Sequence, residues 1–201
     1  MLSIRSIASC LHRPVRRFAG DQRATSAIEF GLVLPLMLAL WFGAVELSEG
    51  IAINRKVTIV ARTIADLASQ QTLNIDAGTM TNLMNATSAV MAPFPASVNS
   101  AAGLRVVVSQ IKIDANSTVT VSWSHANQYG TALTAGAPFT TLPTPFKIAN
   151  SYVILGTAEY DYTTSFIGRW VLSRNLTLKD QMYMAPRQLK CIQYLNVPAS
   201  C

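Results

Sequence analysis

The sequence predicts an α+β protein in which a long N-terminal helix and a second, shorter helix precede a four-stranded antiparallel sheet. Apolar residues first recur at helical spacing, and from residue 104 onward they alternate with polar ones, as they do in half-buried strands. Turn-forming residues separate the alternating segments. Helices followed by a run of strands favour an α+β domain with an antiparallel sheet.

The composition is unusual for a cytosolic protein and argues against nucleic-acid binding. The chain has 201 residues, of which 13% are charged, and a formal net charge of +6. Its mean hydropathy is positive, at +0.30. Part of the basic excess lies before residue 24, and no cluster of Lys and Arg with aromatic residues follows residue 62. A nucleic-acid interface would need such a cluster on the folded part.

The most apolar part of the chain predicts a transmembrane helix. Residues 30–45 read FGLVLPLMLALWFGAV, and residues 24–28 extend this run to 22 positions interrupted only by Glu29. A helix of that length spans about 33 Å, close to the ~30 Å hydrocarbon thickness of a bilayer. Pro35 is compatible with this assignment, because membrane helices tolerate proline better than soluble ones do.

The flanking charges predict the orientation of this helix. Five arginines precede the apolar run, and three basic residues lie in the twenty positions after Val45. The bias places the N-terminus in the cytoplasm and the main domain outside. A secretory signal peptide is the competing interpretation, but the run is long for one and no clear A-x-A cleavage site follows it. The charges that set the orientation include Arg13, Arg16, Arg17 and Arg23.

The chain therefore divides into three predicted regions: a basic leader over residues 1–24, a transmembrane helix over 25–46, and an extracytoplasmic domain over 47–201. The helical pattern continues into the domain, because apolar positions recur at spacings of three and four. We expect one helix of about forty-five residues, whose second half covers a sheet face. The stripe of this second half that would face the sheet consists of Val57, Val60, Ile64, Leu67 and Gln71.

The rest of the domain is predicted as a short helix and four strands. The helix covers residues 75–91, with Asp76 as its N-cap and Pro93 and Pro95 beyond its end. A turn at 114–117 joins the first two strands into a hairpin, and a loop over 128–145 follows. The predicted strands are residues 104–113, 118–124, 152–162 and 175–184.

The sequence offers little catalytic chemistry and no metal or cofactor site. The three cysteines show no CxxC spacing, and His125 is the only histidine in the folded part. Glu159 and Asp161 alternate along a strand and could bind a cation or act as an acid/base pair. We favour a solvated strand face, opposite a core face that carries tyrosines. Cys191 and Cys201 would form a disulfide outside the cytoplasm, or remain two free thiols.

The run RATSAIEFGLVLPLMLALWFGAVEL resembles the TadE-like proteins of bacterial tight-adherence (Flp-type) pilus systems, which are type IV pilin-like. In that family, small residues follow a basic leader and precede Glu-Phe or Glu-Tyr, and a long apolar helix comes next. Further similarity lies near the C-terminus, in the Tyr-x-Tyr strand at Tyr160 and Tyr162, an Ala-Pro-Arg sequence at 185–187, and late cysteines.

The resemblance implies a non-enzymatic minor pseudopilin with type IV pilin-like architecture, held in the bacterial inner membrane. A prepilin peptidase would cut between Ala24 and Thr25, which makes Glu29 the fifth residue of the mature chain. Glu29 and Phe30 would then serve subunit assembly, with Glu29 pairing the new amino group of a neighbour. The implied partners are the peptidase, other pilin-like subunits and the pilus assembly machinery. Ala24 stands where the family commonly has glycine.

Two other interpretations remain open at this point. The first is an unprocessed, membrane-anchored periplasmic scaffold or adhesin domain that never enters a filament. The second is a membrane-anchored hydrolase, which the sequence disfavours because it offers no recognisable catalytic set.

Overall fold

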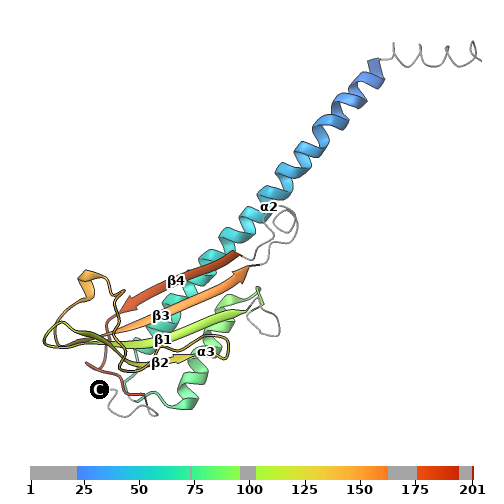
Figure 1. Cartoon of the computed structure of the whole chain (residues 1–201). Helices are drawn as coiled ribbons and strands as arrows, with labels where there is room; N and C mark the ends of the chain where they lie inside the picture. The colour runs from blue at the N-terminus through green and yellow to red at the C-terminus, as the bar shows by residue number, and fades with distance from the viewer. Residues whose placement is uncertain (1–21, 73, 96–102, 163–175, 195–200) are drawn as a thin grey trace, which may run out of the picture. The chain divides into compact units, whose positions relative to one another are not determined.

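Two helices precede four strands, and this order confirms the predicted α+β layout (Figure 1). The structure is a computed structural model that describes residues 22–72, 74–95, 103–162, 176–194 and 201. The chain divides into two compact units, Met1–Leu47 and Ser48–Cys201. The elements are α2 (Gln22–Ser69), α3 (Ala77–Met91), β1 (Leu104–Ile113), β2 (Val119–Ala126), η1 (Thr144–Phe146), β3 (Ser151–Tyr162) and β4 (Leu176–Met184).

Helix α2 runs for 48 residues and contains Pro35 without ending there. Within the second unit, its apolar residues at spacings of three and four are buried, as the periodicity predicted. Leu67 is only partly buried, and Gln71 lies beyond the helix, where its side chain donates to the Leu67 carbonyl at 2.9 Å. The buried stripe consists of Ile53, Val57, Val60, Ala61, Ile64, Ala65 and Ala68.

Helix α3 begins after the predicted cap. The Asp76 Oδ1 atom accepts a hydrogen bond from the Thr79 backbone N–H at 2.6 Å, which satisfies one free donor of the first turn. The helix ends at Met91, before Pro93. It starts two residues later than predicted because Asp76 caps the helix from outside it. Lys56 ties α2 to α3 by donating to the Val90 carbonyl at 3.0 Å.

The sheet has the strand order β2-β1-β3-β4, and all its neighbours are antiparallel. The free edge of β2 is covered by the loop that follows it, since Thr120 pairs with Pro138 and the Val121 N–H donates to the Ala137 carbonyl at 2.9 Å. Part of the predicted loop over 128–145 is therefore held against the sheet.

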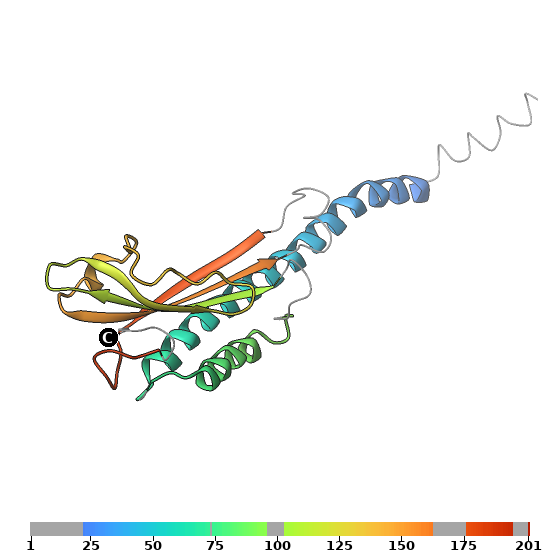
Figure 2. The same ribbon diagram turned by 60° about the horizontal axis from the view of Figure 1, so that its bottom comes forward.

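The main core lies between the sheet and the two helices, which cover the same sheet face (Figure 2). Trp123, Tyr160 and Tyr162 are buried there, so Tyr160 and Tyr162 of β3 face inward as expected. Among the described residues, the opposite face is covered at one end, where Phe139 and Leu142 from the loop pack on strand residues such as Val153.

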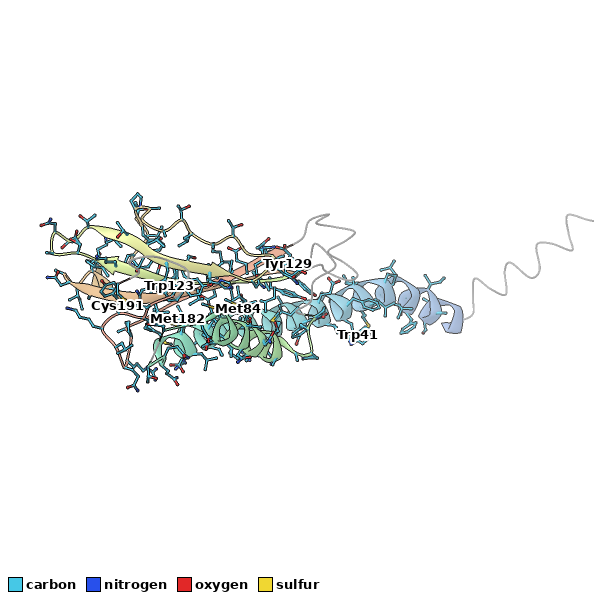
Figure 3. All side chains as sticks on the ribbon, turned by 90° about the horizontal axis from the view of Figure 1, so that it is seen from below. Trp41, Met84, Trp123, Tyr129, Met182 and Cys191 are labelled. Atoms are coloured by element: carbon cyan, nitrogen blue, oxygen red, sulfur yellow. A yellow bond between two sulfur atoms is a disulfide. The ribbon has the colours of Figure 1, made fainter. Side chains whose placement is uncertain are left out.

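The C-terminal segment is bound to the sheet through a buried amide. Gln110 accepts from the Ile192 N–H at 2.8 Å, and Trp123 donates to the Ile192 carbonyl at 2.8 Å. Cys191 and Cys201 are joined by a disulfide whose Cα atoms lie 5.8 Å apart. Figure 3 labels Trp123 and Cys191, which belong to this part of the domain.

Candidate functional site

The part of α2 in the first unit exposes apolar side chains on all sides. A helix that is apolar all round needs a lipid or protein environment. By length and composition, the helix that starts at Thr25 is able to cross a membrane. Trp41, labelled in Figure 3, is among the exposed residues. At least half of the surface is exposed in Ile28, Phe30, Leu32, Leu36, Met37, Leu40, Trp41, Val45 and Leu47.

Glu29 is the acidic group near the start of this apolar helix, and it is exposed. Thr25 precedes it by one helical turn, so the two side chains lie on the same face. Between Thr25 and Leu47 the sequence holds only one other charged residue, Glu46. A carboxylate at membrane depth is costly unless it is paired or protonated, so Glu29 requires a partner or a proton if the helix spans a bilayer.

The structure describes some, but not all, of the other residues predicted to act at this end of the chain. Ala24 and Thr25 both lie within α2, and Thr25 is exposed. Arg23 also lies in α2. The arginines at positions 13, 16 and 17 fall outside the described residues.

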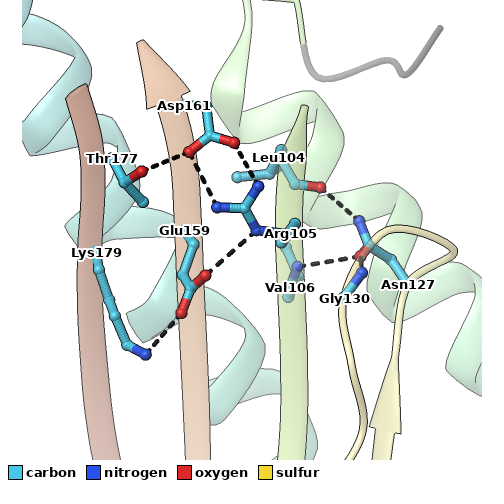
Figure 4. A network of polar contacts seen from close by, with 9 residues as sticks. All are labelled: Leu104, Arg105, Val106, Asn127, Gly130, Glu159, Asp161, Thr177 and Lys179. Carbon is cyan, nitrogen blue, oxygen red and sulfur yellow. Dashed lines mark hydrogen bonds and ion pairs between the residues drawn. The ribbon is translucent and has the colours of Figure 1, made fainter. Parts of the chain in front are cut away.

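The two carboxylates of β3 form an ion-pair network on the open sheet face (Figure 4). Arg105 donates to Asp161 at 2.5 and 3.0 Å and to Glu159 at 3.2 Å. Lys179 lies 2.6 Å from the other Glu159 oxygen, and Thr177 donates to Asp161 at 2.7 Å. Arg105 lies opposite Glu159 in the β1–β3 register, which explains how one guanidinium reaches both carboxylates.

This network makes acid/base chemistry or cation binding by the two carboxylates unfavourable. The hydrogen bond from Arg105 lowers the pKa of Asp161, and the hydrogen bond from Lys179 lowers the pKa of Glu159. Both groups are thus ionised at neutral pH, and two cations already balance their charge. Among the described residues, no group of three His, Cys, Asp or Glu side chains could hold a metal ion.

His125 is half-buried at the end of β2. Its Nδ1 atom lies 2.9 Å from the Tyr194 hydroxyl, and the Tyr194 ring also packs against Trp123 at a centroid distance of 5.4 Å. Burial lowers the pKa of His125. The contact joins residues 69 positions apart, so no local pattern could have predicted it. His125 therefore serves packing between β2 and the C-terminal segment.

The comparison with protein families bears directly on the apolar helix. Residues 24–66 match the family model of the TadE-like protein. This match confirms the resemblance seen in the sequence, and we call residues 24–66 the TadE-like segment. The comparison with curated proteins and the comparison with solved structures gave no match.

The TadE-like segment includes Glu29, the exposed apolar stretch and most of the buried stripe of α2. The match makes these residues similar to the TadE-like family, a family of structural components related to Tad pili. Its apolar helix fits single-pass membrane anchoring. The sheet and its ion-pair network lie outside the matched residues.

Proposed function

We propose that the protein is a minor pseudopilin of a tight-adherence (Flp-type) pilus, a subunit that starts, caps or assembles the filament without catalysing a reaction. Residues 25–46 would anchor it in the bacterial inner membrane, and residues 47–201 would form the periplasmic domain. One observation carries the proposal: the TadE-like segment holds an exposed apolar helix with a glutamate one turn after Thr25.

The proposed mechanism begins with removal of the leader. A prepilin peptidase at the cytoplasmic face cuts between Ala24 and Thr25, and Thr25 gains a free α-amino group. That group is a cation at nearly the same depth as Glu29 of a neighbouring subunit. Because a lone carboxylate in hydrocarbon costs about 3 kcal/mol on insertion scales, pairing favours subunits in register over isolated ones. Cleavage thus creates the charge that permits assembly.

The proposed orientation rests on the arginines of the leader. With Arg13, Arg16, Arg17 and Arg23 on one side, the N-terminus stays in the cytoplasm, where the peptidase acts. The domain and its disulfide then lie in the periplasm, where disulfides form and persist.

A second candidate function is an unprocessed, membrane-anchored periplasmic scaffold or adhesin. Ala24 favours it, because the TadE-like family commonly has glycine before the cut. Intact mass and N-terminal sequencing of the protein from a piliated cell separate the two functions. We expect a chain that begins at Thr25. A chain that keeps Met1 in piliated cells would refute the processing step.

Two variants of Ala24 sharpen this test. Ala24→Gly restores the residue common in the family and is expected to be cut at least as fast as the native chain. Ala24→Phe places a bulky side chain before the scissile bond and is expected to leave the leader attached. Equal processing of both variants would mean that the cut lies elsewhere.

A further inference from the structure

The open face of the sheet carries a groove of about 320 Å³ beside the ion-pair network. Thr157 of β3 and Gln181 of β4, which are paired neighbours, line it. Leu133 and Phe139, from the loop after β2, line it as well. The paired side chains of Glu159 and Lys179 also line the groove.

The position of the groove determines which groups can recognise a ligand. Strands β1 and β3 lie in the middle of the sheet, and each pairs on both sides. Their backbone donors and acceptors are therefore committed to the ladders. An extended peptide that adds to a sheet needs a free strand edge, and here that edge belongs to β4, which contributes the side chains of Lys179 and Gln181 to the groove. A ligand that lies over the middle strands is therefore recognised by side chains.

Several of these side chains have unused hydrogen-bonding capacity. Within the part of the chain that the structure describes, the side chains of Thr131, Thr141, Thr157 and Gln181 make no hydrogen bond. Each hydroxyl and the amide can both donate and accept. These residues come from three different segments and line the same groove, so they offer several convergent polar groups to one ligand.

The charges at the groove restrict the ligand further. The network contains two cations, Arg105 and Lys179, and two anions, Glu159 and Asp161, so it carries no net charge. A strongly charged ligand would meet one repelling group for each attracting one. Leu133 is 38% exposed and adds an apolar surface at the groove. The matching ligand is uncharged, rich in hydroxyl groups and apolar on its C–H faces.

We propose that this groove binds a neutral oligosaccharide. Sugar hydroxyls would exchange hydrogen bonds with Thr157, Gln181 and the loop threonines, while a ring face packs against Leu133 and Phe139. The inference concerns the folded domain alone. It stands whether or not residues 25–46 enter a filament, so its failure would not affect the proposed pilus function.

The test uses the full chain in phosphatidylcholine nanodiscs, because alkyl glycoside detergents would compete for the groove. Maltotriose, cellotriose, lactose and tri-N-acetylchitotriose are titrated by calorimetry, with sialyllactose as the charged counterpart of lactose. We expect saturable binding of at least one neutral sugar, with a dissociation constant on the order of 1 mM. Failure of all four to saturate at about 10 mM would overturn the proposal.

Two groove variants and one control locate the binding. Thr157→Val and Gln181→Leu remove polar groups with little change of shape, and each is expected to weaken binding by about tenfold. Thr120→Val makes a similar change on β2 outside the groove and should bind as the native chain does. Native affinity in both groove variants would place the sugar elsewhere and refute the assignment.

A second readout does not depend on these variants. In protein labelled at Leu and Val methyl groups, the bound sugar should shift the signals of Val107, Leu133 and Leu155, which line the groove. The signals of Val57 and Val60, which lie in the helix–sheet core, should stay in place. Shifts confined to other methyl groups would also overturn the proposal.

Discussion

Gly156 of β3 lies directly against Ala61 of α2. A Cβ atom at position 156 would stand 2.5 Å from the Ala61 carbonyl oxygen and 2.8 Å from the Ile64 side chain. No real Cβ atom tolerates such a distance to backbone. The absence of a side chain at this position therefore lets the helix pack closely against the middle of the sheet.

Replacing Gly156 by alanine is expected to destabilise the domain by about 3 kcal/mol, because the helix must move away from the strand. Chemical denaturation of the chain in nanodiscs, followed by tryptophan fluorescence, measures the change. Gly78→Ala is the matched control, since the nearest atom there lies at 3.7 Å and alanine favours a helix by about 0.5–1 kcal/mol. Equal stability of the two variants would contradict the close contact.

The Arg105 network predicts a pH-dependent contribution to stability. Both Asp161 and Glu159 have a lowered pKa in the folded protein, mainly through hydrogen bonds from Arg105 and Lys179 respectively. Their contribution is complete above the unfolded pKa values of about 4 and is lost as pH falls through the folded ones. Arg105→Met should therefore cost about 1–2 kcal/mol at pH 7 and less below pH 4.

The measurement is the free energy of unfolding of the native chain and of Arg105→Met at several pH values. Lys147→Met serves as a control, because it removes an exposed cation that belongs to none of the ion pairs among the described residues. We expect the loss of unfolding free energy in Arg105→Met to become smaller at acidic pH. The change in unfolding free energy in Lys147→Met should stay near zero at every pH. A constant Arg105 difference would assign the loss to packing instead of charge.

The periodicity of the sequence predicted the two helices and the four strands, but not the short helix η1. β1 has the predicted bounds, and β3 starts one residue earlier than predicted. Asp76 caps its helix because the cap is a local interaction over three residues. Such features depend on neighbours in the chain, so local patterns predict them.

Contacts between distant segments could not be predicted in this way. Arg105 reaches Glu159 across 54 positions, and Gln110 binds the Ile192 N–H across 82. Both contacts require the strand order and register, which a single sequence does not specify. The same reason explains why the role of Gly156 was missed. The apolar helix and Glu29 were recognised because the run is continuous in sequence.

The disulfide predicts a redox-dependent stability. Reduction, or Cys201→Ser, should lower the free energy of unfolding by about 3 kcal/mol. A disulfide that closes a loop of this size removes about that much conformational entropy, as free energy, from the unfolded chain. The experiment uses a Cys10→Ser background, so that only two cysteines remain. Alkylation should label no thiol before reduction and two after it. Two reactive thiols in the untreated, exported protein would refute the bond.

Glu29 predicts a defect in assembly without a defect in insertion. Because pairing with a neighbour's amine would favour association, Glu29→Ala should reduce pilus formation at least about tenfold, equivalent to 1.4 kcal/mol. The membrane fraction should hold as much protein as before, since the change makes the helix more apolar. Glu46→Ala removes the other carboxylate between Thr25 and Leu47 and serves as the control. Unchanged piliation in Glu29→Ala would contradict the pairing.

A double variant tests whether Glu29 and the new N-terminus act together. With Ala24→Phe the leader stays attached, and Thr25 has no free amino group to offer. Once that partner is missing, Glu29→Ala should add no further loss, so the double variant should form as many pili as Ala24→Phe alone. The comparison requires that Ala24→Phe alone still forms a measurable number of pili. Raising the expression of the variants can provide this level. Independent, additive losses would mean that Glu29 serves assembly through another partner.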